Sequence, residues 1–351
     1  MIKLAANLLT SLLLAVVSVT VAALLAVPCA LLRWVEACGR YFRGSVDLRG
    51  QVVVVTGAAG GFGTCVSRAL IARGATVVGC DVVPADAIDK AVGVVDDSRT
   101  GGKLVAVKSD ITKPADLAHL VERVKALCKD EKKTLYCLVN NAGITGNPGA
   151  VFENGADNMR AVFEVNCLAP VDLVRALYPM ILKGASGNRG GGAAPTRGRV
   201  VNVTSVAGLV SGAGLGNYTA SKYALEAMSD CLRMEVKDEF DVAIIEPYFA
   251  DTGIYRALAN RSDDELRKSK LAEHLLKAKE RAKAKRIGNT QIMTPEFVSD
   301  VIVRSIVEAR PRDRYLVAPN PVVQGLIRAL MHLPNYCFLV DGMKDVMRRL
   351  R

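Results

Sequence analysis

Short apolar runs rich in β-branched residues alternate along the chain with longer stretches in which apolar residues recur every three or four positions. The short runs, bounded by turn residues, are typical of strands buried on both faces, and the longer spacing is typical of helices that pack on a sheet. Strands are predicted at residues 52–55, 75–80, 104–107, 135–139, 199–203, 242–245 and 314–317. Helices are predicted at 64–73, 114–128, 156–182 and 295–309, with a further one beginning near Tyr218. This alternation predicts an α/β fold with a doubly wound parallel sheet in a single domain.

The N-terminal segment has a different character. Residues 4–32 include no charged side chain, and as a helix they would measure roughly 43 Å, more than the ~30 Å hydrocarbon core of a bilayer. Lys3 precedes the segment and several arginines follow it, so the positive-inside bias places the remainder of the chain on the cytoplasmic side. We therefore predict a membrane anchor and basic linker at residues 1–45. The alternative is a cleaved signal peptide, for which Ala26–Ala30 offers a small-residue region.

The rest of the chain divides into a main domain at 46–318 and an amphipathic extension at 319–351. Within the main domain, the glycine-rich residues 183–199 are predicted to be a flexible insertion. Residues 253–290 are polar and mostly helical in pattern, so they are predicted either to close over a ligand or to form a solvated helix pair. The extension could pack on the core, lie in a membrane interface or meet another subunit.

Composition narrows the functional classes. The formal net charge is +11, but the segment from Arg261 to Arg286 holds ten Lys or Arg against five Asp or Glu and includes no aromatic residue. This distribution favours a solvated face or an anionic membrane surface, and no nucleic-acid partner is expected. The three histidines are scattered, which argues against a histidine-based hydrolase. The nine cysteines form no Cys-x-x-Cys pair, so we expect free thiols and no metal site.

A glycine-rich turn follows the first predicted strand. Thr56–Gly63 reads Thr-Gly-Ala-Ala-Gly-Gly-Phe-Gly and leads into a helix. Glycines let the backbone turn tightly and approach a pyrophosphate, which the N–H groups of the helix N-terminus receive, as in a Rossmann-type fold. Asp81 ends the second predicted strand, where a carboxylate accepts hydrogen bonds from the adenosine ribose hydroxyls and repels a 2′-phosphate. No Lys or Arg lies in the glycine turn or directly after Asp81, so NAD is favoured over NADP.

Tyr218 and Lys222 are four residues apart at the start of a predicted helix, so they share one face. A tyrosine has a pKa of about 10, and a cation beside its oxygen favours the phenolate and lowers that pKa. Ser205 follows a predicted strand, at the sheet edge where ligands bind, and Asn166 is polar in an apolar helical stretch. Taken singly, each of these residues is equally typical of an ordinary helix or strand end.

Together these residues resemble the short-chain dehydrogenase/reductase family over about Val46 to Thr252. The motif Thr-Gly-x-x-x-Gly-x-Gly is present, Asn-Asn-Ala-Gly follows the fourth predicted strand, and a serine lies thirteen residues before the tyrosine. The resemblance implies that Tyr218 is the acid–base group, that Lys222 binds the nicotinamide ribose and lowers the Tyr218 pKa, that Ser205 holds the substrate oxygen, and that Asn166 positions a relay water. The cofactor-binding residues that it implies are Gly57, Gly61, Phe62, Gly63, Asp81, Asp110, Ile111, Asn140, Ala142, Gly143, Tyr218, Lys222, Pro247 and Thr252.

Within the family, the anchor, Ile244–Pro247 and Pro311–Tyr315 resemble the branch that holds retinol, hydroxysteroid and 3-hydroxybutyrate dehydrogenases. This resemblance implies a lipophilic alcohol or ketone as substrate and a single-pass protein of the endoplasmic reticulum with a cytoplasmic catalytic domain. The oligomeric state is not fixed by the sequence; a homo-oligomer is one possibility, because the helix equivalent to that of Tyr218 and its neighbour pack between subunits in many family members. A small hydroxy acid is the alternative substrate, and a non-catalytic NAD-binding membrane protein is the alternative function. One departure is Tyr248, which follows Pro247 where the family usually has glycine, so the cofactor pose and the pocket width are open.

Overall fold

The computed structural model describes residues 44–93, 96–131, 133–187, 197–253, 258–284, 286–287 and 290–331. The predicted anchor at 4–32 lies outside the described residues. Within the described part of the chain, one helical stretch, Gly155–Leu182, is long and apolar enough to cross a membrane. Leu173, Leu177 and Ile181 of that stretch lie in the core against the sheet, so its apolar composition is accounted for by packing.

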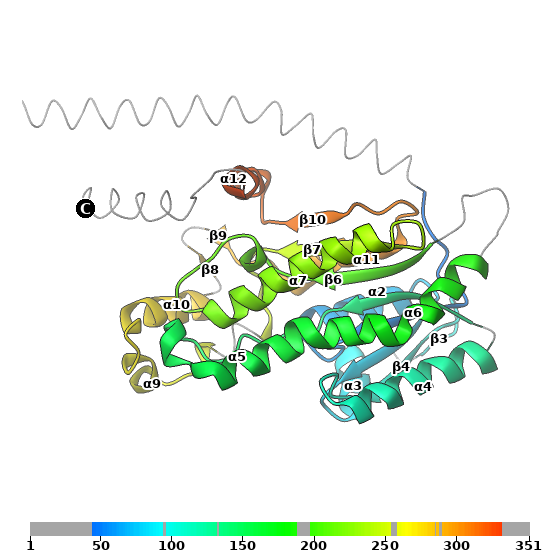
Figure 1. Ribbon diagram of the computed structural model, residues 1–351, viewed down its shortest axis with the longest axis horizontal. Coiled ribbons are helices and arrows are strands. Elements are labelled where there is room, and N and C mark those ends of the chain that lie inside the picture. Colours follow the sequence, from blue (N-terminus) through cyan, green and yellow to red (C-terminus); the bar gives the residue numbers. More distant parts are fainter. Residues whose placement is uncertain are drawn as a thin grey trace, which may run out of the picture.

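In the described part of the chain, eight strands form one sheet at the centre of the fold (Figure 1). Its strands, in the spatial order β10-β7-β6-β5-β1-β2-β4-β3, are parallel except for β3, which pairs antiparallel with β4. The bounds are β1 (Gln51–Thr56), β2 (Thr76–Asp81), β3 (Asp96–Asp97), β4 (Gly102–Lys108), β5 (Thr134–Asn140), β6 (Gly198–Val203), β7 (Phe240–Pro247) and β10 (Arg314–Val317). The predicted doubly wound parallel sheet in one Rossmann-type domain is therefore confirmed.

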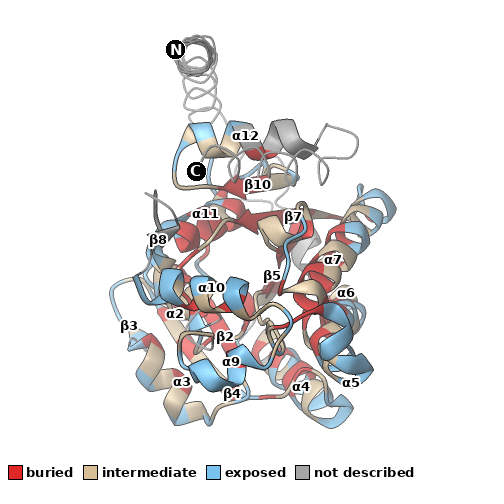
Figure 2. Ribbon diagram, turned by 90° about the vertical axis from the view of Figure 1, so that its left-hand side faces the viewer, coloured by how far each residue is buried: buried red, intermediate tan, exposed pale blue. Residues whose placement is uncertain are grey.

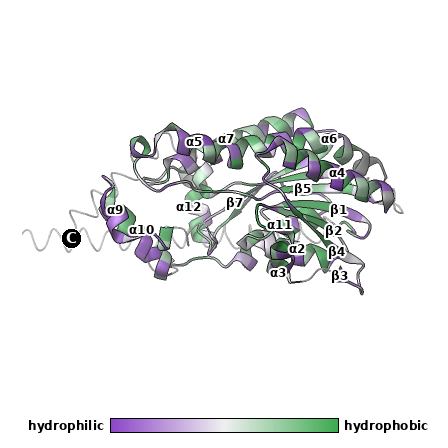
Figure 3. Ribbon diagram, turned by 90° about the horizontal axis from the view of Figure 1, so that it is seen from below, coloured by the Kyte–Doolittle hydropathy of each residue, from purple (hydrophilic) through white to green (hydrophobic). Residues whose placement is uncertain are grey.

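Helices cover both faces of the sheet, and Figure 3 shows the sheet between its two layers of helices. One face carries α2 (Gly61–Ile71), α3 (Ala85–Val92) and α11 (Pro295–Val307), and the other carries α4 (Pro114–Asp130), α5 (Gly155–Phe163), α6 (Ala169–Gly187) and α7 (Gly216–Glu235). β1 is buried along its whole length, and the central strands lie inside a shell of helices with exposed outer surfaces (Figure 2). The apolar strand pattern thus reflects burial on two faces.

The polar excursion after β7 is helical, as predicted. It contains α9 (Asp263–Arg267) and α10 (Ala272–Ala284), followed by the two-stranded pair β8 (Arg286–Ile287) and β9 (Thr290–Gln291). Short helical turns η1 (Val151–Glu153) and η3 (Val206–Gly208) follow β5 and β6, and α12 (Pro321–Met331) follows β10. The extension beyond residue 331 lies outside the described residues.

Three predicted boundaries were wrong. The helix after β1 begins at Gly61, inside the glycine turn. The long helix at 156–182 is interrupted by a π-helical turn, η2 (Glu164–Leu168), before α6 continues to Gly187. The predicted flexible insertion at 183–199 is consequently shorter, because its first residues are helical and β6 begins at Gly198; residues 188–196 lie outside the described part of the chain.

Candidate active site

The glycine turn packs backbone against backbone. Gly57 has a φ of +66°, and a Cβ atom on it would lie 3.0 Å from the Cα of Ala142. A Cβ on Gly63 would lie only 2.0 Å from the carbonyl oxygen of Gly57. Glycine is therefore required at both positions, first for a left-handed turn and then for the close contact between helix and strand end.

The residues around this turn fit a pyrophosphate. Helix α2 begins after Gly60 with no side-chain cap and no acidic residue in its first turn. Its first backbone N–H groups therefore have no side-chain acceptor from the cap or the first turn, and they can donate hydrogen bonds to an anion. Thr252 closes the turn from the other side, because a Cβ on Gly61 would lie 3.4 Å from its Cγ2. Phe62 packs on the core below the turn.

Asp81 is fixed at the end of β2, beside the glycine turn. One carboxylate oxygen accepts a 3.0 Å hydrogen bond from the Ala59 N–H, and the other accepts a 2.8 Å bond from the Val82 N–H. Two backbone donors thus orient the carboxylate while each oxygen keeps a lone pair for a hydroxyl group. This arrangement fits a ribose at the position predicted for it.

Asn140 to Gly143 tie three strand ends together. The Asn140 side chain donates a 2.8 Å bond to Asn202 on β6, and the Thr56 hydroxyl accepts bonds from the N–H groups of Asn141 (3.0 Å) and Ala142 (2.9 Å). These bonds hold the loop after β5 against β1 on one side and β6 on the other. The backbone at Gly143 is thereby placed at the carboxyl edge of the sheet.

The remaining predicted cofactor residues lie on the same edge. Ser109 after β4 donates its N–H to the Asp81 carbonyl at 2.8 Å, which places Asp110 beside β2. The Asp110 carboxylate accepts the N–H and hydroxyl of Thr112, and the hydroxyl bond lowers the pKa of that carboxyl. Ile111 is buried in the core, and Pro247 ends β7.

The Tyr248 side chain packs against neighbouring parts of the fold. Its side chain is partly buried and packs against the core cluster on the α2–α11 face, and its ring meets the Phe249 ring edge-on at 4.8 Å between centroids. Its N–H donates to the Val317 carbonyl at 2.8 Å, which extends the contact between β7 and β10. The residue that departs from the family pattern is therefore a packed part of the fold.

Tyr218 and Lys222 are both buried on α7. The Lys222 Nζ donates a 2.9 Å bond to the carbonyl of Val203, the last residue of β6. Burial lowers the pKa of Lys222 to about 8, against the opposing charge of Glu226. Burial also raises the pKa of Tyr218, whereas a hydrogen bond from Ser205 acts to lower it. The expected lowering of the Tyr218 pKa by Lys222 is thus not found in the protein alone, because desolvation of the phenol dominates.

Asn166 lies in the π-helical turn and is fully buried. Its Oδ1 accepts the Ile144 N–H at 2.8 Å, and its Nδ2 donates to the Ile144 carbonyl at 2.8 Å and to the Ser221 hydroxyl at 2.9 Å. The side chain therefore clamps the loop after β5 to α7. A π turn widens the helix at one point, which is common at functional sites.

The fold gathers the four predicted catalytic residues. A Cβ atom on Gly143 would lie 3.3 Å from the Asn166 Oδ1 and 3.5 Å from the Lys222 Nζ, and the Ser205 side chain is close enough to Tyr218 to act on the pKa of its phenol. Glu226 was not among the predicted site residues, but it continues the series of residues spaced by four on α7 that includes Tyr218 and Lys222. That spacing was a usable signal, although its partner Arg314 is far along the chain.

Fold and site together define a dinucleotide-dependent oxidoreductase with a tyrosine–lysine pair. A family model described as short chain dehydrogenase matches residues 51–263, so the chain belongs to the short-chain dehydrogenase family and is an enzyme of the alcohol dehydrogenase type. The predicted family membership is confirmed.

Known relatives agree with this assignment. Human "Retinol dehydrogenase 16" is 30% identical over 308 residues, which are 84% of this chain and 88% of that protein. Bovine "D-beta-hydroxybutyrate dehydrogenase, mitochondrial" is 30% identical over 238 residues, 65% of this chain and 64% of that one. The crystal structure of a short chain dehydrogenase/reductase from Burkholderia phymatum in complex with NAD is 26% identical, with a TM-score of 0.61 over 81% of this chain and 93% of the other.

Proposed function

We propose that this enzyme interconverts a lipophilic alcohol and its carbonyl compound with NAD, and that Tyr218 is the general acid and base. The observation that carries the proposal is the convergence of a buried phenol, a buried ammonium and a serine hydroxyl at the carboxyl edge of the sheet. These groups lie beside a turn whose residues fit a dinucleotide.

NAD would supply a hydride acceptor, and the residues of the chain would supply the rest. The turn at Gly57–Gly63 and the N-terminus of α2 would hold the pyrophosphate, and Lys222 would bind the second ribose. Ser205 would hold the substrate oxygen and stabilise the charge that develops on it. Tyr218 would take the hydroxyl proton in oxidation and return it in reduction. Asn166 would keep the loop at Ile144 and helix α7 in register, and would position a water that joins Lys222 to solvent.

The choice of NAD rests on Asp81. Its carboxylate is held at the ribose position by Ala59 and Val82, where a 2′-phosphate would meet a like charge. The Burkholderia phymatum relative was crystallised with NAD, which supports the same choice.

A lipophilic substrate is supported by apolar side chains near the start of α7. Val151 and Phe152 are 62% and 74% exposed, and a Cβ on Gly216 would lie 2.3 Å from the Val151 Cγ2. Val151 therefore contacts α7 at Gly216, two positions before Tyr218 in the sequence, and Phe152 is the next residue in the chain. The segment between α9 and α10 contacts the same loop at Glu153. The name of the human relative, "Retinol dehydrogenase 16", is consistent with such a substrate.

We propose that residues 1–45 anchor the protein in the endoplasmic reticulum membrane, with the catalytic domain on the cytoplasmic side. We also propose that the protein self-associates through α7. The apolar segment at 4–32 and the arginines after it support the anchor. Exposed Met228 and Met234 on α7 support an interface there. Glycosylation-site insertion mapping and analytical ultracentrifugation test these two statements.

A small hydroxy acid is the second candidate substrate, because the bovine relative carries the name D-beta-hydroxybutyrate dehydrogenase. A carboxylate substrate needs hydrogen-bond donors, and His274 on α10, whose imidazole can donate one, lies against Gly214 just before α7. A non-catalytic NAD-binding protein is the alternative outside enzymology.

The test is turnover of the purified full chain in detergent with retinol, a hydroxysteroid and 3-hydroxybutyrate, using NAD and then NADP. We expect NADH formation with a lipophilic alcohol, and Tyr218→Phe should reduce it by roughly 10²–10⁴-fold. Activity on the acid alone would reverse the substrate assignment. Equal rates for wild type and Tyr218→Phe would refute the assigned role of Tyr218, and NAD binding without turnover of any alcohol would favour the non-catalytic alternative.

A further inference from the structure

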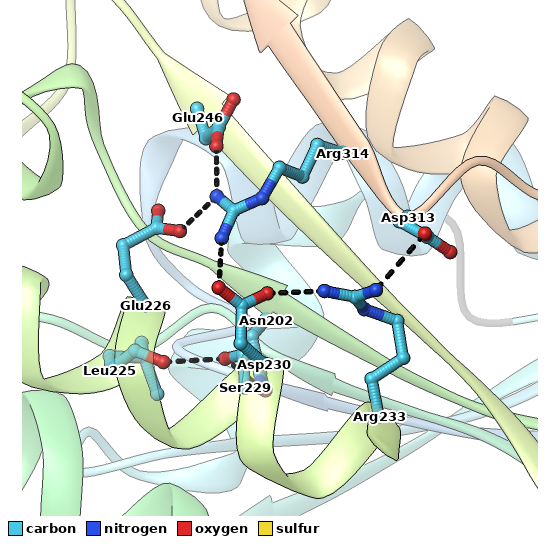
Figure 4. Close-up of polar contacts among 9 residues, drawn as sticks. All are labelled: Asn202, Leu225, Glu226, Ser229, Asp230, Arg233, Glu246, Asp313 and Arg314. Atoms are coloured by element: carbon cyan, nitrogen blue, oxygen red, sulfur yellow. Dashed lines mark hydrogen bonds and ion pairs between the residues drawn. The ribbon is translucent and has the colours of Figure 1, made fainter. Parts of the chain in front are cut away.

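A cluster of charged side chains connects the helix that carries Tyr218 to the edge strand β10 (Figure 4). Glu226, Asp230 and Arg233 come from α7, and Glu246 comes from β7. Arg314 is the first residue of β10, and Asp313 immediately precedes that strand. The proposed mechanism uses none of these residues. Several are partly or fully buried, so their arrangement requires an explanation.

Arg314 is the centre of this cluster. Tyr315 and Val317 point into the core on the α2–α11 face, so Arg314, preceding them, projects toward the opposite face, where α7 packs. Its Nη1 lies 2.5 Å from both Glu226 Oε2 and Glu246 Oε1, and its Nη2 lies 2.5 Å from Asp230 Oδ2. One guanidinium therefore joins β10 and β7 to two successive turns of α7.

Glu226 connects this cluster to the catalytic pair. Tyr218, Lys222 and Glu226 follow one another at intervals of four residues, so they lie on one face of α7. Lys222 is 3% exposed and Glu226 is 6% exposed. Two opposite charges thus stand one helical turn apart in a region from which water is excluded, where their attraction is much stronger than at a surface.

The other groups around Lys222 are weaker sources of support. Tyr218 lies on its own helix, Cys167 and Asn166 face it from η2, and the Val203 carbonyl faces it from β6. Burial lowers the pKa of Lys222, the Glu226 charge is the main influence that raises it, and Cys167 follows. Burial likewise raises the pKa of Glu226, and Arg314, which donates a hydrogen bond to its carboxylate, opposes that rise. Arg314 thus favours the carboxylate form of Glu226, and that negative charge in turn favours the ammonium form of Lys222.

We infer that Glu226, anchored by Arg314, is a positioning residue for Lys222, because its carboxylate holds the buried lysine in the ammonium form and fixes the rotation of α7 that presents Tyr218. The inference rests on the proposed function of the Tyr218–Lys222 pair. The ion pair between α7 and β10 thereby affects catalysis, although it lies outside the substrate and cofactor contacts.

The first experiment compares pH profiles of kcat for wild type and Glu226→Gln, with NAD and the best alcohol substrate. Loss of the carboxylate charge should move the alkaline limb to lower pH by about one unit. Glu226→Asp keeps the charge and should restore most of the profile, and Arg314→Gln should shift the same limb in the same direction. Asp230→Asn removes a different Arg314 partner, one turn further from Lys222, and should leave the limb in place. Superimposable profiles for wild type and Glu226→Gln would overturn the inference.

A second measurement needs no turnover. In the full chain labelled with ¹³Cε-lysine, the Lys222 resonance is assigned by its disappearance in Lys222→Met and titrated with pH. The apparent pKa of Lys222 should be lower in Glu226→Gln than in wild type, and an unchanged titration refutes the link. If wild type turned over no alcohol, the proposed function would fail while this titration still decided the role of Glu226. If Glu226→Gln did not fold, the same titration in Arg314→Gln would decide it.

Discussion

The ammonium of Lys222 lies 5.8 Å from the centroid of the Tyr218 ring, one turn along the same face of α7. Burial works against the charged form of each group, since it lowers the pKa of Lys222 to about 8 and raises the pKa of Tyr218. The pair is therefore a costly arrangement for the folded protein. Such a cost is typical of a site arranged for chemistry at the expense of stability.

Replacing the buried lysine should make this cost measurable. Lys222→Met should abolish turnover and raise the free energy of unfolding at pH 7 by about 1–2 kcal/mol, because a desolvated cation is removed while one hydrogen bond to Val203 is lost. The pKa of Lys222 is about 8 in the fold and 10.5 without it. Between these values the unfolded chain keeps a proton that the native protein has released, so wild-type stability rises with pH and the advantage of Met disappears.

Urea denaturation at pH 7 and pH 9.5 measures both parts of this prediction. Lys237→Met, at an exposed position just beyond the end of α7, is the control and should change stability by less than about 0.5 kcal/mol at either pH. A Lys222→Met protein less stable than wild type at pH 7 would contradict the prediction.

Asp81 should control the choice of coenzyme. In Asp81→Ser the like charge that opposes a 2′-phosphate is gone, so the ratio of kcat/KM for NAD to that for NADP should fall by roughly 100-fold. Steady-state kinetics with the two coenzymes measures this ratio. Asp86→Asn removes an exposed carboxylate from the first turn of α3 and should leave it unchanged. An unaltered preference in Asp81→Ser would show that another group selects NAD.

Much of the fold followed from local patterns. The strands are buried on both faces, so their apolar runs marked them directly, and the glycine turn is dictated by the short contact between Gly57 and Gly63. The spacing of Tyr218, Lys222 and Ser205 predicted that these residues lie together, because helix geometry and strand ends fix where such residues lie.

Other features depend on contacts between distant segments and left no local signal. The π turn at Asn166 is stabilised by bonds to Ile144 and Ser221, which lie on separate elements. The partnership of Glu226 and Arg314 joins residues 88 positions apart. The raised pKa of Tyr218 also comes from burial, which the spacing to Lys222 could not reveal.

A methyl group at Gly63 should disable the cofactor site. In Gly63→Ala the new Cβ would lie 2.0 Å from the Gly57 carbonyl oxygen, so the turn must open and the α2 N-terminus must move away from the strand end. NADH binding followed by its fluorescence should weaken by at least about 100-fold, the effect of roughly 2.7 kcal/mol. Gly212→Ala, whose Cβ would meet no atom within 4 Å, should bind NADH as wild type does. Normal binding by Gly63→Ala would mean that the dinucleotide does not use this turn.

Glu153 should hold the α9–α10 excursion over the site. Its carboxylate accepts 2.6 Å bonds from the Ser269 hydroxyl and the Lys270 N–H, while a 2.9 Å bond from the Ala150 N–H fixes it to its own loop. In Glu153→Ala these bonds are lost, so amide hydrogen exchange in α9 and α10 should become several-fold faster. KM for a lipophilic alcohol should rise more than kcat falls, because the binding surface loosens while Tyr218 is untouched.

Glu280→Ala is the matched control, because it removes an exposed carboxylate from α10. It should change neither the exchange rates nor KM. Unchanged exchange in Glu153→Ala would show that the excursion is held by other contacts, and a fall in kcat at constant KM would place its effect on the chemistry instead of on substrate binding.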